Sequence, residues 1–129
     1  MSLSVTEPSK QRKLLYTSPS HRIRKLLTAP LSKDLRQNYG RRSYPVRKGD
    51  TVKIQRGDFS GVEGKITKVD TRRQRIFVEG VQREKVAGTS TTVSVPSSKV
   101  LITILNLDDK WRSESVKLTA TSRSREERA

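Results

Sequence analysis

The stretch at residues 48–70, KGDTVKIQRGDFSGVEGKITKVD, holds four of the chain's seven glycines between two β-strand patterns. Gly57 and Gly61 flank the tripeptide Asp58-Phe59-Ser60, and glycine accepts the positive φ angles that tight turns require. Gly64 begins the second strand pattern, where the absence of a side chain lets a neighbouring strand approach closely. The stretch therefore predicts two strands joined by a tight turn.

The pair Gly64-Lys65 raises the alternative of a loop that binds nucleotide phosphates. Such a loop needs a glycine five residues before Gly64 and a Ser or Thr after the lysine, but this chain has Phe59 and Ile66 there. A β-branched strand pattern follows instead of the helix N-terminus that would present amides to phosphate. The spacing excludes this kind of site.

Residues 46–109 continue as short apolar segments separated by turn residues, including TVKIQR, GKITKVD, RIFVEG, TVSV and KVLITIL. Val52 and Ile54 alternate with polar neighbours, which is typical of a strand buried on one face. Several short strands with tight connections favour a mainly β fold. We expect a small, highly curved, five-stranded barrel.

Residues 1–45 read as a basic N-terminal arm with two short helices. Residues 1–17 lack a periodic apolar pattern, and we expect no structure of their own there. Ser18 and Ser32 are candidate N-caps of the two helices, and Gly40 is the stop signal of the second. Neither apolar face is large, so both helices need the barrel or a partner to pack against.

Residues 110–129 form a C-terminal tail that we expect to be part helix and part disordered. It contains Trp111, which, like Tyr39 in the second predicted helix, is expected to be a packing residue.

The chain's charge points to a polyanionic partner. It has 28 Lys and Arg against 13 Asp and Glu, a net charge of +15, of which +8 lies in residues 1–45, +4 in residues 46–109 and +3 in the tail. This excess is typical of nucleic-acid-binding proteins, with an anionic membrane surface as the second candidate. The narrow apolar face of the first predicted helix argues against membrane binding.

Composition also limits the other function classes. With no cysteine and a single histidine, His21, the chain offers no thiolate or imidazole cluster for a metal. His21 is instead a candidate phosphate contact. No apolar run is long enough to span a membrane, and no signal peptide is recognisable, so we expect a soluble intracellular protein. No carboxylate near the turn has a histidine or thiol partner for catalysis, and neither an enzyme nor a cofactor is expected.

The run VRKGDTVKIQRGDFSGVEGKITKVD resembles a KOW motif, the glycine-centred strand-loop-strand of RNA-associated SH3-like barrels. The flanking runs LSKDLRQNYGRRSYPVRKGD, VEGVQREKVAGT and PSSKVLITILNLDDK are similar to the large-subunit ribosomal protein family numbered twenty-four in bacteria and twenty-six in eukaryotes, in its archaeal and eukaryotic branch. The resemblance covers roughly residues 9–112. It departs at VSVPSSKV, where the family pattern has a histidine and then a proline one position later.

The resemblance implies an SH3-like barrel and a structural role in the cytoplasmic large ribosomal subunit. It implies binding to large-subunit rRNA, early assembly near the polypeptide exit tunnel, and neighbouring ribosomal proteins as partners. A KOW motif alone would also fit a transcription-elongation-associated module that docks on RNA polymerase. Such modules carry an additional α/β domain, for which residues 1–45 are too short.

Basic side chains at places that a rigid fold would display are the candidate RNA contacts, because Arg and Lys bind backbone phosphates. They are Arg12, Lys13, Arg22, Arg24, Lys25, Arg36, Arg41, Arg42, Arg47, Lys48, Arg56, Lys65, Lys68, Arg72, Arg73, Arg83 and Lys85. The candidate KOW loop comprises Gly57, Asp58, Phe59, Ser60, Gly61 and Gly64.

Two aromatic residues leave alternatives open. Phe59 and Tyr44 are candidates for stacking on splayed RNA bases, although an aromatic residue beside a turn more often covers the core. Asp58 is expected to accept hydrogen bonds from amides of its own loop.

Overall fold

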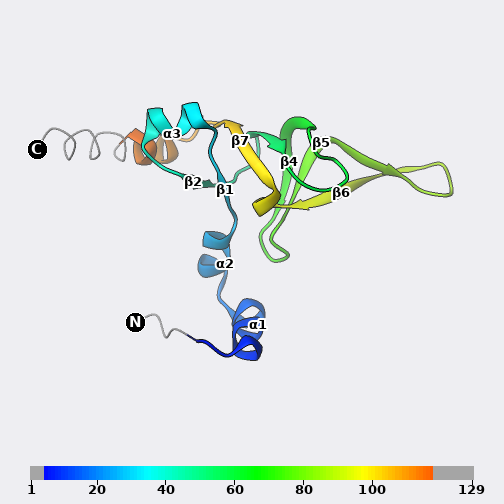
Figure 1. Ribbon diagram of the computed structural model, residues 1–129, viewed down its shortest axis with the longest axis horizontal. Helices are drawn as coiled ribbons and strands as arrows, with labels where there is room; N and C mark the ends of the chain where they lie inside the picture. The colour runs from blue at the N-terminus through cyan, green and yellow to red at the C-terminus, as the bar shows by residue number, and fades with distance from the viewer. Residues whose placement is uncertain (1–4, 118–129) are drawn as a thin grey trace, which may run out of the picture.

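A five-stranded antiparallel sheet lies at the centre of the computed structural model, which describes residues 5–117 (Figure 1). Its hydrogen-bonded order is β6-β5-β4-β3-β7. The strands are β3 (Thr51–Ile54), β4 (Glu63–Asp70), β5 (Arg75–Glu84), β6 (Ser90–Pro96) and β7 (Val100–Ile104). The prediction of a mainly β fold built on five strands is confirmed.

Strand β4 is shared between two neighbours along its length. Residues 63–65 pair with β3, whereas residues 66–70 pair with β5. The register shifts between Ile66 and Lys68, and irregularities of this kind bend a strand and increase its twist. Register shifts also occur in the β3–β7 and β5–β6 pairs, so the sheet has several points at which bending is favoured.

The predicted closure into a barrel is wrong for the described residues, because no pairing joins the outer strands β6 and β7. A 3-10 turn, η1 (Ser97–Lys99), connects these two strands. The outer edge of β7 meets the N-terminal segment instead: Leu31 forms a parallel bridge with Ile102, and the Ser32 amide donates to the Ile102 carbonyl oxygen at 2.9 Å. The position that β6 would need for closure is therefore occupied.

The N-terminal segment contributes a second, two-stranded sheet of β1 (Thr28–Pro30) and β2 (Ser43–Pro45). Its apolar side chains enter the same core as those of the central sheet. The core contains Leu27, Ala29, Leu31, Tyr44, Val46, Val52, Ile54, Ile66, Ile76, Val78, Val81, Val95, Val100, Ile102, Leu105 and Val116. One hydrophobic cluster thus joins both sheets.

Both predicted short helices are present, as α2 (Ser20–Leu26) and α3 (Lys33–Tyr39). Pro19 rather than Ser18 is the N-cap of α2. In α3 the Ser32 hydroxyl accepts from the Leu35 amide at 3.5 Å, and Gly40 ends the helix at φ +65°. Tyr39 packs against the core as predicted.

Helix α1 (Pro8–Thr17) corrects the expectation that residues 1–17 have no structure of their own. Pro8 occupies the first turn, where a missing amide costs nothing, and the following Lys, Gln, Arg and Leu residues favour helix. An ion pair joins Lys10 and Glu7 at 2.9 Å. The helix buries no residue, so its sequence has no periodic apolar pattern from which the helix could be predicted.

Residues 110–117 are helical, which confirms the helical part of the predicted tail; residues 118–129 lie outside the described part of the chain. Arg112 and Val116, four positions apart on one face, are buried. Trp111 is 80% exposed, so the prediction that it packs in the core is wrong. It lies one position before Arg112 and is thereby turned away from the buried face.

The turn between β3 and β4 has the conformation that the glycine pattern predicts. Gly61 adopts φ +89°, and its amide donates to the Ile54 carbonyl oxygen at 2.7 Å. A Cβ atom on Gly64 would lie 2.6 Å from the Glu79 carbonyl oxygen of the neighbouring strand. Both glycines are therefore required by the backbone, and Phe59 between the strands packs against the core.

Gly64→Ala is expected to lower the free energy of unfolding by about 1–3 kcal/mol, because the added methyl group meets a backbone atom that cannot rotate away. Urea unfolding of the full chain measures the change. The exposed neighbour Lys65 provides a control, and Lys65→Ala should change stability by less than about 0.5 kcal/mol. Equal midpoints for both variants would contradict the close approach at Gly64.

Candidate nucleic-acid interface

Helices α1 and α2 lie on the side of the molecule toward which the β4–β5 turn projects (Figure 1). Two adjoining concavities on this side gather basic side chains. Both include Thr71, and among residues 5–117 no carboxylate lines either one. The inner groove is lined by Arg24, Arg47, Lys48 and Lys68 together with Leu27, Val46, Thr67, Val69 and Thr71. The outer hollow is lined by Leu15, Tyr16, Ser18, Ser20, Ile23, Thr71, Arg72, Arg73, Gln74, Arg75 and Ser94.

The inner groove collects cations from three elements that the fold holds side by side. Arg24 lies on α2, Lys48 on the loop between β2 and β3, and Lys68 on β4. In β4, Lys68 is exposed while Ile66, two residues earlier, is buried; the register shift between them breaks the strict alternation of the strand. The irregularity therefore helps to place a cation on the surface of β4, between the buried Ile66 and the partly buried Val69.

These cations are largely available to a ligand. Arg24 and Lys48 make no side-chain hydrogen bond or ion pair within residues 5–117, and the Lys68 ammonium lies 5.8 Å from the centroid of the Phe77 ring. Several uncompensated positive charges around one groove attract a polyanion, and their mutual repulsion is relieved when one binds.

Arg47 is the exception in the inner groove, because its Nη1 donates to Asp109 Oδ2 at 2.6 Å. This hydrogen bond holds the pKa of the Asp109 carboxyl below its ordinary value. A lowered pKa means that the pair contributes to stability above the ordinary titration range of aspartate and loses that contribution as the pH falls through the lowered pKa. Both side chains are well exposed, so the contribution is small.

The outer hollow differs from the inner groove in combining one cationic wall with one apolar wall. Arg72, Arg73 and Arg75 come from the β4–β5 turn and the start of β5, whereas Tyr16 and Ile23 come from α1 and α2. Sequence reasoning included Arg72 and Arg73 but missed Arg75 and Tyr16. The position of Arg75, two residues after the Arg72-Arg73 pair, was a sequence signal for a further basic contact. Tyr16 had no such signal, because the sequence analysis predicts no structure for residues 1–17.

The other predicted RNA contacts are distributed over the remaining surface. Most are exposed on the helices, on the loop before β2, on the β3–β4 turn with the start of β4, or near the tip of the β5–β6 hairpin: Arg12, Lys13, Arg22, Lys25, Arg42, Arg56, Lys65, Arg83 and Lys85. Neither concavity includes them.

Three predicted contacts also have partners within the fold. Arg36 is partly buried and its Nε donates to the Leu31 carbonyl oxygen at 2.8 Å. The Arg41 guanidinium lies 5.3 Å from the centroid of the Tyr44 ring. Arg83 donates to the Asp58 carboxylate at 3.1 Å, so Asp58 binds an arginine of β5 rather than the loop amides that we expected.

Of the two aromatic residues considered for base stacking, Tyr44 belongs to the core and Phe59 is partly buried against it. Tyr44 is 6% exposed, and the guanidinium groups of Arg41 and Arg112 each lie 5.3 Å from its ring centroid. Phe59 packs against the core cluster. The alternative in which they cover the core is therefore confirmed.

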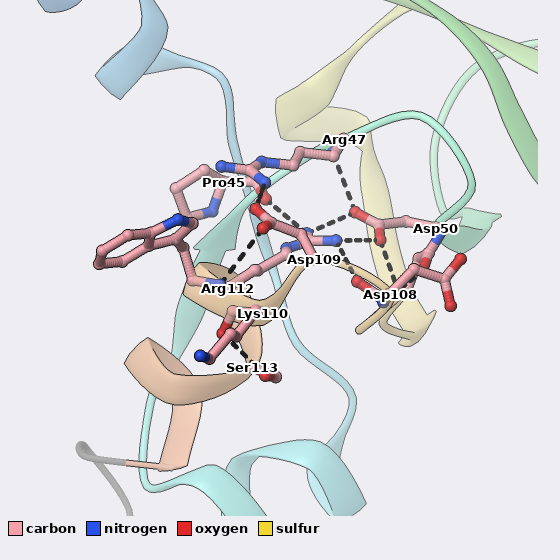
Figure 2. Close-up of polar contacts among 10 residues, drawn as sticks. Pro45, Arg47, Asp50, Asp108, Asp109, Lys110, Arg112 and Ser113 are labelled. Atoms are coloured by element: carbon pink, nitrogen blue, oxygen red, sulfur yellow. Dashed lines mark hydrogen bonds and ion pairs between the residues drawn. The ribbon is translucent and has the colours of Figure 1, made fainter.

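A buried ion pair between Asp50 and Arg112, which the sequence analysis does not predict, lies next to the loop that carries Arg47 and Lys48 (Figure 2). Asp50 is fully buried and Arg112 is 3% exposed. The guanidinium donates to both carboxylate oxygens, at 2.6 and 2.7 Å, and also to the carbonyl oxygens of Asn106 and Pro45 at 2.8 and 3.0 Å. Asp50 further accepts from the amides of Arg47 and Asn106, each at 2.9 Å.

This ion pair connects three parts of the chain. Pro45 ends β2, Asp50 precedes β3, and Arg112 lies on the C-terminal helix (Figure 2). Arg47 and Lys48 of the inner groove lie in the loop between the first two, so the buried pair fixes the backbone that presents them. No sequence motif marks such a pair, because the partners are 62 residues apart.

No group of His, Asp or Glu side chains suited to a metal ion occurs in the described part of the chain. None of the helices between residues 5 and 117 combines the length and apolar character that a membrane-spanning helix requires.

A family model for the eukaryotic ribosomal protein L26 and its archaeal counterpart matches residues 5–118. The chain belongs to this ribosomal protein family. The match extends from before α1 to the C-terminal helix, so the L26 family model covers both concavities and the buried ion pair. The resemblance identified from the sequence is confirmed.

Three archaeal relatives each align with more than four fifths of this chain. The large ribosomal subunit protein uL24 of Saccharolobus solfataricus is 50% identical over 110 residues, which are 85% of this chain and 92% of the relative. The proteins of the same name from Korarchaeum cryptofilum and Sulfolobus acidocaldarius are each 48% identical, over 87% and 86% of this chain and 86% and 83% of their own lengths.

Proposed function

We propose that this protein is a structural constituent of the cytoplasmic large ribosomal subunit, and that it binds large-subunit rRNA through the inner groove and the outer hollow. The observation that carries the proposal is the inner groove, in which four cations from three elements line a concavity that no carboxylate of residues 5–117 lines. Family membership and the names of the archaeal relatives support the ribosomal setting.

The family resemblance supports a more specific role. We infer that the β3–β4 turn is the family's KOW loop, and that the protein supports early folding of rRNA near the polypeptide exit tunnel, beside neighbouring ribosomal proteins. Cations in fixed positions offset the repulsion between phosphates when RNA helices converge. The exposed arginines and lysines on α1 and α2 extend the basic surface beyond the groove.

The alternative, an elongation-associated module docking on RNA polymerase, shares only the KOW-like stretch with this chain. A match over residues 5–118 favours the ribosomal role instead. Sedimentation of a cell lysate on a sucrose gradient separates the two. The ribosomal proposal requires the protein to travel with the large subunit, and co-sedimentation with RNA polymerase would contradict it.

Removing three inner-groove cations should flatten the salt dependence of rRNA binding. Each lost phosphate contact lowers the magnitude of the slope of log K against log salt by about 0.7–0.9, so we expect a decrease of about 2–3 units. The variant combines Arg24→Ala, Lys48→Ala and Lys68→Ala in the full chain, with large-subunit rRNA as the probe. Arg47 is left intact because it pairs with Asp109.

A matched control removes three exposed lysines that line neither concavity, with the same change of net charge. It combines Lys33→Ala, Lys53→Ala and Lys99→Ala. Its slope should decrease by less than about one unit. Equal slopes for the two triple variants would show that RNA responds to net charge alone, and the inner groove would not be the binding site.

A further inference from the structure

The outer hollow combines an aromatic side chain with several arginines, and such groups together can bind a flat, uncharged ring next to phosphates. Tyr16 on α1 is 83% exposed and lines the hollow, although an aromatic ring of this size gains free energy when it is covered. Leu15 and Ile23 extend the apolar wall beside it. The opposite wall carries the guanidinium groups of the β4–β5 turn.

Helix α1 lacks support from the rest of the protein, because none of its residues is buried. A helix of this length is marginal in water without a packing partner. A ligand held between Tyr16 and the β4–β5 turn would supply that partner, since the two walls come from elements distant in sequence. The occupant must therefore contact both an aromatic ring and several arginines.

We propose that the outer hollow binds a single unpaired nucleotide of the rRNA, with its base stacked on Tyr16 and its phosphates contacted by Arg72 and Arg73. A nucleotide is the occupant that carries a planar ring and anionic groups together. Two polar side chains that also line the hollow, Ser20 and Gln74, are the candidate donors to base edges. The inference rests on the proposed function and adds a base-stacking site to a surface of phosphate contacts.

An RNA hairpin with one unpaired 2-aminopurine in its stem tests the proposal against the same hairpin with that base paired. The full-length protein should bind the bulged hairpin more tightly and quench its 2-aminopurine fluorescence, because stacking on an aromatic side chain quenches this base. Tyr16→Ala should weaken binding to the bulged hairpin about fivefold to a hundredfold and abolish the quenching. Binding to the paired hairpin should remain unchanged.

Two further variants separate stacking from helix stability. Tyr16→Phe keeps the ring and should retain affinity and quenching, whereas Leu14→Ala alters an exposed residue of the same helix outside the hollow and should have no effect. Alanine is a better helix former than tyrosine, so weaker binding by Tyr16→Ala would not reflect loss of α1.

Equal binding of both hairpins by the unaltered protein, or equal weakening of both by Tyr16→Ala, would overturn the nucleotide site while leaving rRNA binding intact. Unchanged affinity for the bulged hairpin in Tyr16→Ala would overturn it as well and point to a protein segment as the occupant. Failure of the unaltered protein to bind either hairpin in a salt-dependent way would overturn the proposed function itself.

Discussion

Asp50→Ala is expected to lower the free energy of unfolding by about 3–5 kcal/mol, because the substitution leaves a buried guanidinium without its counter-ion. The loss extends beyond the charge pair. Asp50 also accepts from the amides of Arg47 and Asn106, and a buried donor without an acceptor adds its own desolvation cost. Urea unfolding of the full chain, followed by circular dichroism, measures the change.

Asp58→Ala is the matched control, because it removes the same carboxylate from an exposed pair with arginine. The Asp58 and Arg83 side chains are 82% and 65% exposed, and such pairs contribute less than about 1 kcal/mol. If the two alanine variants lost similar stability, the Asp50–Arg112 contact would be no more important than a surface ion pair.

Arg112→Met should be less damaging than Asp50→Ala. An unbranched apolar side chain fills much of the space of arginine, and the Asp50 carboxylate keeps its two amide donors. The native guanidinium is also not fully satisfied, since its buried Nε has no hydrogen-bond partner among the described residues. A larger loss of stability in Asp50→Ala than in Arg112→Met, measured by urea unfolding, would identify Asp50 as the centre of the network.

Leu31→Ala is expected to lower the free energy of unfolding by about 2–5 kcal/mol, the usual cost of truncating a fully buried leucine. Leu31 lies in the N-terminal segment, is completely buried, and forms a bridge with Ile102 of β7. We therefore propose that residues 27–45 unfold together with the sheet and do not act as a detachable arm. Denaturant unfolding of the full chain measures the loss.

Leu14→Ala applies the same chemical change on α1, where the leucine is 47% exposed, and should cost less than about 0.5 kcal/mol. A similarly small effect of Leu31→Ala would mean that the N-terminal segment is only loosely attached to the sheet. A deletion of residues 1–45 would not isolate an intact sheet, because it would remove Leu27, Ala29 and Tyr44 from the core.

Local signals in the sequence predicted the local structure well. The positions of Gly61 and Gly64, the cap at Ser32 and the stop at Gly40 each depend on a few neighbouring residues, so their effect is readable without knowledge of the fold. The alternation of apolar residues predicted the strands for the same reason.

Tertiary features could not be predicted in the same way. Whether the sheet closes depends on which segment pairs with the outer edge of β7. Leu31 forms that contact with Ile102, although it lies 71 residues before Ile102 in the chain. The Asp50–Arg112 pair and the position of Tyr16 opposite the β4–β5 turn likewise require the folded arrangement. Charge alone could not separate Arg24, in the inner groove, from Arg36, which hydrogen-bonds to the backbone.

The long separation between Asp50 and Arg112 has a consequence for how the chain folds during its synthesis. The chain leaves a ribosome N-terminus first, so every strand of both sheets emerges before Arg112 does. Until then the Asp50 carboxylate lacks its counter-ion and favours water over the interior. A chain that ends between residues 105 and 111 therefore has every strand but lacks the counter-ion of Asp50, and we expect proteases to cleave it faster than the full chain.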